Sequence, residues 1–157
     1  MFGLASETVF RSLLCMQLFT TFAMTGLIWL VQLVHYPLFD RVDDSKFVQF
    51  ESDHSNGITV IVLPLMVAEL ASAVLLAILR GGRTDAVWWY AGLAAVVLLW
   101  ASTFFLSVPE HSRLMQGFDA DSHRRLVLTN WPRTILWSLR SGGLLFILWG
   151  LVRTPID

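Results

Sequence analysis

The chain has 157 residues, of which 55% are hydrophobic and only 15% are charged, and its formal net charge is −1. A soluble domain carries about 25% charged residues, so this composition excludes an ordinary soluble domain and a disordered chain. The single cysteine excludes a disulfide scaffold. The near-neutral charge, with no block of basic residues, predicts that the protein has no nucleic-acid partner.

Four apolar stretches hold almost none of the charge. Each of them contains at most one charged residue: 12–39, 54–79, 86–109 and 134–152. Each is long enough to cross a hydrocarbon core of about 30 Å as a helix, and a helix pairs its own backbone polar groups in lipid. The sequence therefore predicts an all-α, polytopic membrane protein, with residues 1–157 forming a single domain built on a four-transmembrane-helix bundle.

The spans are predicted, in chain order, near residues 11–35, 57–79, 87–108 and 132–152. The first lacks a basic start and a small-residue cleavage site, so we interpret it as a retained helix rather than a signal peptide. Four spans place both ends of the chain on one face, here called side A, and the long connections 36–56 and 109–131 on the opposite face, side B. Lys and Arg are nearly balanced between the sides, so the orientation stays open. We expect contact with the lipid bilayer of the cell (inner) membrane, and a homo-oligomer.

The first side-B connection is expected to carry a short surface helix. Asp43 is a suitable N-cap for a helix that begins near Lys46, and Glu51 and His54 would share one face of it. Carboxylate-bridged di-iron bundles use the Glu-x-x-His spacing twice. This chain has it once, so the di-iron signal is weak.

The second side-B connection is expected to carry two short helices. Residues 107–110, Ser-Val-Pro-Glu, match a capping box, and Gly117 is a suitable stop for the helix that follows. A second short helix is expected to start at Asp119 or Asp121. Residues 129–132, Thr-Asn-Trp-Pro, would then begin the fourth span.

All four histidines fall on side B: His35, His54, His111 and His123. Histidine is the commonest metal ligand and a natural proton carrier near neutral pH. Together with Glu51 these histidines are the predicted metal ligands, with copper, iron or zinc as the transition metal. The alternative is that they are interfacial side chains that bond to the backbone at helix ends.

Glu69 and Arg140 are the two charged residues inside the spans, and they lie at similar depths. A carboxylate within a membrane is costly and is a functional-site candidate by default. Glu69, His35 and His111 are therefore the predicted catalytic residues, while a buried Glu69–Arg140 pair that only fixes helix packing is the alternative. Arg133, at the side-B mouth, could hold an anionic group or reach a lipid phosphate, and we favour the lipid phosphate.

Three motifs resemble those of a known family. They are the His-Tyr-Pro of residues 35–37, the Val-Pro-Glu-His-Ser-Arg-Leu of 108–114 and the Asn-Trp-Pro-Arg-Thr of 130–134. The pattern is similar to the anthrone-oxygenase-like integral membrane proteins. Fungal members of that family oxidise an anthrone to an anthraquinone with dioxygen, so the resemblance implies a hydrophobic aromatic substrate and an oxygen-dependent oxidation. It assigns no catalytic residue and no cofactor.

Three functions follow from these patterns. The first is a membrane oxidoreductase that acts on a hydrophobic small molecule in a pocket near side B, lined by His35, His54, His111, Glu51 and Glu69. The second is a haem-binding membrane protein with His35 and His111 as axial ligands. The third is a non-enzymatic subunit or small transporter in which Glu69 and Arg140 are structural or relay protons.

Overall fold

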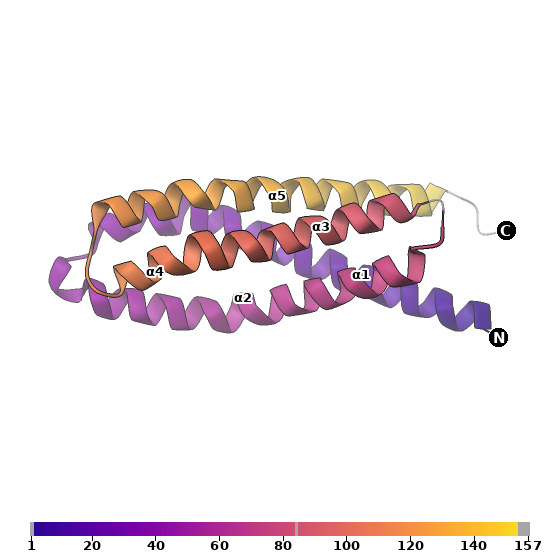
Figure 1. Cartoon of the computed structure of the whole chain (residues 1–157), viewed down its shortest axis with the longest axis horizontal. Helices are drawn as coiled ribbons and strands as arrows, with labels where there is room; N and C mark the ends of the chain where they lie inside the picture. Colours follow the sequence, from indigo (N-terminus) through magenta and orange to yellow (C-terminus); the bar gives the residue numbers. More distant parts are fainter. Residues whose placement is uncertain (1, 84, 154–157) are drawn as a thin grey trace.

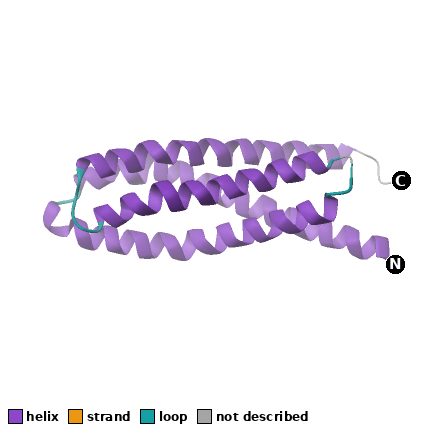
Figure 2. Ribbon diagram, viewed as in Figure 1, coloured by secondary structure: helices purple, strands orange, loops and turns teal. Residues whose placement is uncertain are grey.

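The computed structural model describes residues 2–83 and 85–153, and these residues form helices and short connections without any strand. Four long helical segments lie side by side in an elongated bundle (Figures 1 and 2), which confirms the predicted all-α four-helix architecture. The elements follow in this order: α1 Phe2–Leu30, the π turn η1 Val31–His35, the 3-10 segment η2 Tyr36–Arg41, α2 Asp44–Arg80, α3 Ala86–Ser102, the π turn η3 Thr103–Ser107, α4 Val108–Leu114 and α5 Ala120–Arg153.

Four of the helical segments are long and apolar enough to cross a membrane: Ser6–Arg41, Asp44–Arg80, Ala86–Leu114 and Ala120–Arg153. The start of α1, the end of α5 and the turn between α2 and α3 lie at one end of the bundle, at the right of Figure 1, which is side A. The α4 helix, the connection between α1 and α2 and the connection between α4 and α5 lie at the other end, side B. The chain is an integral membrane protein with the predicted arrangement of sides.

The prediction of a separate short surface helix before the second span is wrong. Asp43 does cap a helix, since its Oδ1 accepts a hydrogen bond from the Ser45 backbone N–H at 2.9 Å, and its hydrogen bonds with Ser45 hold the pKa of Asp43 below its usual range. The helix then continues through Gly57 as the 37-residue α2. Gly57 alone costs a helix only about 1 kcal/mol, which the buried contacts on both sides of it outweigh.

The prediction of a separate short helix before the fourth span is wrong for a similar reason. Asp119 Oδ1 accepts a hydrogen bond from the Ser122 backbone N–H at 2.7 Å, and the hydrogen bonds with Ser122 hold the pKa of Asp119 below its usual range. From Ala120 the α5 helix continues for 34 residues, through Asn130 and Pro132. Asn130 is fully buried inside α5 rather than being a cap.

The α4 helix occupies the predicted place, but it has no capping box. Ser107 is itself in a helical conformation and makes no capping hydrogen bond, because the chain enters α4 directly from η3. The helix ends at Leu114, three residues before the predicted stop at Gly117. Gly117 has a φ of 140°, a backbone conformation that glycine adopts without a steric penalty.

Both α1 and α3 end in a π turn followed by a proline. In η1 the Tyr36 N–H donates to the Val31 carbonyl, and in η3 the Val108 N–H donates to the Thr103 carbonyl, so each turn is one residue wider than a regular helical turn. A proline ring in a regular helix clashes with the carbonyl four residues earlier. The wider π turns avoid this clash at Pro37 and Pro109. They also place His35 and Ser107 at the side-B end of the bundle.

The interior and the outer surface match a bundle in lipid. Three buried apolar clusters follow one another along the bundle, represented by Leu76, Leu99 and Leu126. Large apolar side chains such as Phe105 face outward. Trp89, near the side-A end, is buried, and its Nε1 donates to Asp85 Oδ2 at 2.9 Å.

Candidate functional site

A chain of polar side chains crosses the side-B end of the bundle. Glu51 of α2 is fully buried, and its Oε1 lies 2.5 Å from Nδ1 of His111, which α4 supplies. The other ring nitrogen of His111, Nε2, lies 3.0 Å from the hydroxyl of Tyr36. With a neutral imidazole, Nδ1–H donates to the carboxylate and Nε2 accepts from the phenol. Carboxylate, imidazole and phenol thus form a continuous route for a proton.

Two further histidines lie beside this chain. His35 Nε2 and His54 Nδ1 are 2.8 Å apart, and the centroid of the His54 ring lies 5.4 Å from that of His111. The predicted gathering of His35, His54 and His111 is therefore observed. His123 differs, because its Nε2 donates to the backbone carbonyl of Tyr36 at 2.8 Å. For His123 the structure matches the backbone-bonding alternative.

The five predicted metal ligands do not form a metal centre in this arrangement. Within residues 2–83 and 85–153, no three His, Cys, Asp or Glu side chains are grouped so that they could hold a metal ion. Both ring nitrogens of His111 already have protein partners. Ligation of copper, iron or zinc by these residues stays a prediction without structural support, and so does haem ligation by His35 and His111.

A cavity of about 310 Å³ opens next to the polar chain. Tyr36, His54 and His111 line its side-B part, while deeper in the bundle its wall is largely apolar and includes Met24 and Met66. Sites for small molecules have volumes of roughly 300–1,000 Å³ and combine a mostly apolar wall with a few convergent polar groups. The cavity has the size and the lining of such a site.

Arg133 also lines this cavity, contrary to the expectation that it reaches a lipid phosphate. It is only 7% exposed. Its Nη2 donates to Oδ1 of Asn130, whose Nδ2 donates in turn to Gln32 Oε1 at 2.8 Å. Arg133 is close enough to the Tyr36 hydroxyl to interact with it electrostatically. These contacts hold the guanidinium inside the bundle, because Asn130 is buried in the same turn of α5.

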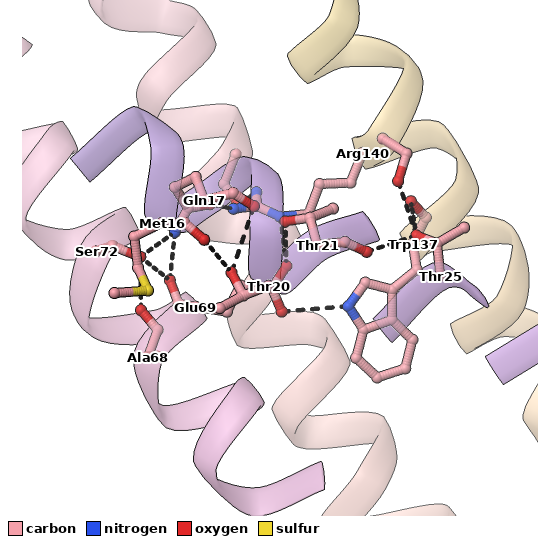
Figure 3. A network of polar contacts seen from close by, with 12 residues as sticks. Met16, Gln17, Thr20, Thr21, Thr25, Ala68, Glu69, Ser72, Trp137 and Arg140 are labelled. Carbon is pink, nitrogen blue, oxygen red and sulfur yellow. Dashed lines mark hydrogen bonds and ion pairs between the residues drawn. The ribbon is translucent and has the colours of Figure 1, made fainter. Parts of the chain in front are cut away.

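Glu69 and Arg140 form the predicted ion pair in the middle of the bundle (Figure 3). Arg140 Nε donates to Glu69 Oε1 at 3.0 Å. The same oxygen accepts from Thr21 Oγ1 at 2.6 Å, and Glu69 Oε2 accepts from Trp137 Nε1 at 3.2 Å. Both carboxylate oxygens therefore have partners in the protein.

The rest of the guanidinium is also bonded. Its Nη1 donates to the Gly92 carbonyl at 2.5 Å, and its Nη2 donates to Gln17 Oε1. Gln17 Nε2 donates to Ser72 Oγ at 2.6 Å, which extends the network along α2 (Figure 3). Saturation of this kind favours a packing role for the pair. Glu69 does not line the cavity next to His111, so its catalytic role stays a prediction.

Sequence reasoning did not select three residues that line the cavity: Tyr36, Trp100 and Ser107. Tyr36 is one of only two tyrosines in the chain and directly follows His35, so its position was a usable signal. Trp100 lies in an uncharged apolar stretch, where nothing in the local pattern separates it from lipid-facing neighbours, and Ser107 was interpreted only as part of a capping box.

The fold and this site define a class: a helical integral membrane protein with a hydrogen-bonded polar chain and an adjoining apolar cavity at one end of a four-helix bundle. No protein-family model matches the sequence, and comparisons with curated proteins and with solved structures find no significant match. The resemblance to the anthrone-oxygenase-like proteins therefore stays a prediction.

Proposed function

We propose that this protein is a membrane oxidoreductase that takes a hydrophobic small molecule into the side-B cavity and removes a proton from it there. The observation that carries the proposal is the chain Glu51–His111–Tyr36, which begins at a fully buried carboxylate and ends at the cavity wall. A base buried beside an apolar cavity meets its substrate without competition from water.

Each member of the chain has a distinct part in the proposed proton transfer. Tyr36 and His111 both line the cavity, so the proton passes to His111 either directly or through the Tyr36 hydroxyl. Glu51 orients the imidazole and stabilises the imidazolium that forms, as a carboxylate does in other acid–base pairs. His54 lies beside His111, and His35 lies within hydrogen-bond distance of His54, so these two rings offer the next positions for the proton.

The oxidative half of the proposal rests on the family resemblance. The methylene group of an anthrone lies between two aromatic rings, and its deprotonated form is delocalised onto the carbonyl oxygen, so a general base can remove its proton. Dioxygen is the oxidant. Overall, one anthrone and one dioxygen give one anthraquinone and one water, which balances atoms and electrons.

The test uses the full chain in nanodiscs with a hydroxylated anthrone in air. Anthraquinone formation is followed by absorbance and dioxygen consumption by an electrode, and we expect one dioxygen per anthraquinone at a rate above that of empty nanodiscs. Because a general base contributes about 10²- to 10⁴-fold, His111→Gln should remove most of that excess, and Tyr36→Phe should lower it. His123→Gln is the matched control and should leave the rate unchanged. A native rate equal to spontaneous oxidation would contradict the proposal.

A non-enzymatic subunit or small transporter is the second candidate. The saturated network around Glu69 and Arg140 favours it, because a pair with every group bonded has the features of a packing element. No excess rate with any anthrone, in a protein that stays folded, would favour this candidate. The cell (inner) membrane and self-association stay predictions under either function.

A further inference from the structure

Three polar atoms on the cavity residues are buried and have no hydrogen-bond partner: Trp100 Nε1, Ser107 Oγ and Arg133 Nε. Buried polar groups in proteins are almost always paired, so three orphaned atoms around one cavity require an explanation. The other unpaired buried atoms among the described residues belong to Glu51, Ser102 and Glu110, which do not line this cavity.

The three atoms share one chemical preference. An indole N–H and a guanidinium N–H can only donate a hydrogen bond, and a serine hydroxyl can donate as well. An acceptor group in the cavity would therefore be complementary to each of them. The three residues come from α3, η3 and α5, and all of them line the cavity.

The charge of Arg133 adds a second requirement. No carboxylate in the described chain lies within ion-pair distance of it, and the polar groups beside it, the Asn130 amide and the Tyr36 hydroxyl, are neutral. A buried cation without a counter-charge is costly. An oxygen that carries full or partial negative charge would relieve this cost, whereas a hydrocarbon would not.

We propose that Trp100, Ser107 and Arg133 form an acceptor-binding subsite in the side-B cavity, which holds the carbonyl or phenolate oxygen of an otherwise apolar molecule. The inference rests on the proposed function and deepens it. When His111 removes a proton from a carbon conjugated with a carbonyl group, negative charge moves onto the carbonyl oxygen. Donors that are already in place stabilise that oxygen in the transition state.

The test compares 9-fluorenone with fluorene, two molecules of similar shape that differ in having a carbonyl or a methylene group. Binding is measured by equilibrium dialysis with the full chain in alkyl maltoside micelles, which contain neither phosphate nor ester carbonyl groups. The carbonyl oxygen of 9-fluorenone can accept hydrogen bonds from these donors, one of which is charged, whereas the methylene group of fluorene cannot. We therefore expect 9-fluorenone to bind about tenfold more tightly than fluorene.

The decisive variant is Trp100→Phe combined with Ser107→Ala. Neither polar atom has a protein partner, so the substitutions break no hydrogen bond in the fold. We expect most of the preference for the ketone to disappear while fluorene binds as before. Ser107→Ala alone, the smaller change, should lower the preference in part. Trp88→Phe, on the same helix but away from this cavity, is the matched control and should have no effect.

Three results would overturn the inference. The first is equal binding of the two molecules, and the second is binding of neither. The third is a preference that is present in maltoside but lost in phosphatidylcholine nanodiscs, which would assign the subsite to a lipid headgroup instead of a small molecule. Turnover of an anthrone is measured separately, so the proton-transfer proposal can survive each of these results, and the subsite can survive a failure of turnover.

Discussion

At the scale of single residues, Glu69 and Arg140 are the most costly groups to leave unpaired. Their side chains are 1% and 5% exposed, and each bonds to several partners as well as to the other. Removing one member of a buried ion pair leaves an uncompensated charge, which costs far more than the intact pair contributes.

We therefore predict that Glu69→Gln lowers the free energy of unfolding by about 3–5 kcal/mol, because it leaves the Arg140 guanidinium buried without a counter-charge. Reversible unfolding in mixed micelles measures the change. The double variant Glu69→Gln with Arg140→Gln should recover part of the loss. Glu7→Gln, in the exposed pair with Arg11, is the control and should have no measurable effect. Full stability of Glu69→Gln together with lost activity would instead support the catalytic role predicted for Glu69.

At the scale of elements, the two π turns determine which side chains reach the site. Such turns occur often at functional sites, because the one extra residue turns the following side chains relative to a regular helix. Here η1 ends at His35 and η3 ends at Ser107, and each is followed within two residues by a proline. The prolines favour the wide turns because a regular helix would clash at each of them.

The π turn at His35 leads to a second prediction. Pro37→Ala restores a backbone donor that can bond to the Leu33 carbonyl, so η1 should shift toward a regular helix and separate His35 from His54. We expect unchanged helix content by circular dichroism and a slower anthrone oxidation. Pro64→Ala, in the middle of α2 and away from any π turn, is the control and should raise stability without changing the rate. Equal rates for both variants would show that the turn does not position the site.

The elements also show what sequence can and cannot predict. The four spans were predictable because hydropathy is a local property, and the caps at Asp43 and Asp119 were predictable because they bond to nearby residues. The continuity of α2 and α5 was not. Gly57 and Pro132 indicate a break locally, and the contacts that outweigh this, such as Asn130 with Gln32, join residues 98 apart in sequence.

The candidate site was predictable only in part for the same reason. The shared side of His35, His54 and His111 followed from counting spans, and their gathering is observed. The partnership of Glu51 with His111 joins residues 60 apart, and that of Tyr36 with His111 joins residues 75 apart. The burial of Arg133 depends on Asn130, whose apparent role in the sequence was to begin a helix.

At the scale of the whole molecule, the length of the helices separates the two polar networks in depth. A helix of 37 residues is about 55 Å long, against a hydrocarbon core of about 30 Å. Glu69 lies far along α2 from its side-B start, whereas Glu51 lies in the second turn. The ion pair is therefore surrounded by hydrocarbon, while the Glu51–His111–Tyr36 chain lies near the side-B interface. Under the proposed function, a proton released at the site would therefore have a short way to water.

This arrangement predicts the outcome of a labelling experiment on sealed membrane vesicles with a membrane-impermeant maleimide. Arg83→Cys, in the side-A turn, and Gln116→Cys, after α4 on side B, should be labelled from opposite faces. Cys15, the one native cysteine, is exposed on the lipid-facing surface of α1, so the unsubstituted chain should give no signal until it is denatured. Labelling of both new cysteines from one face would rule out four crossings. The face that labels Gln116→Cys also identifies the compartment next to the candidate site, because the site lies at that end of the bundle.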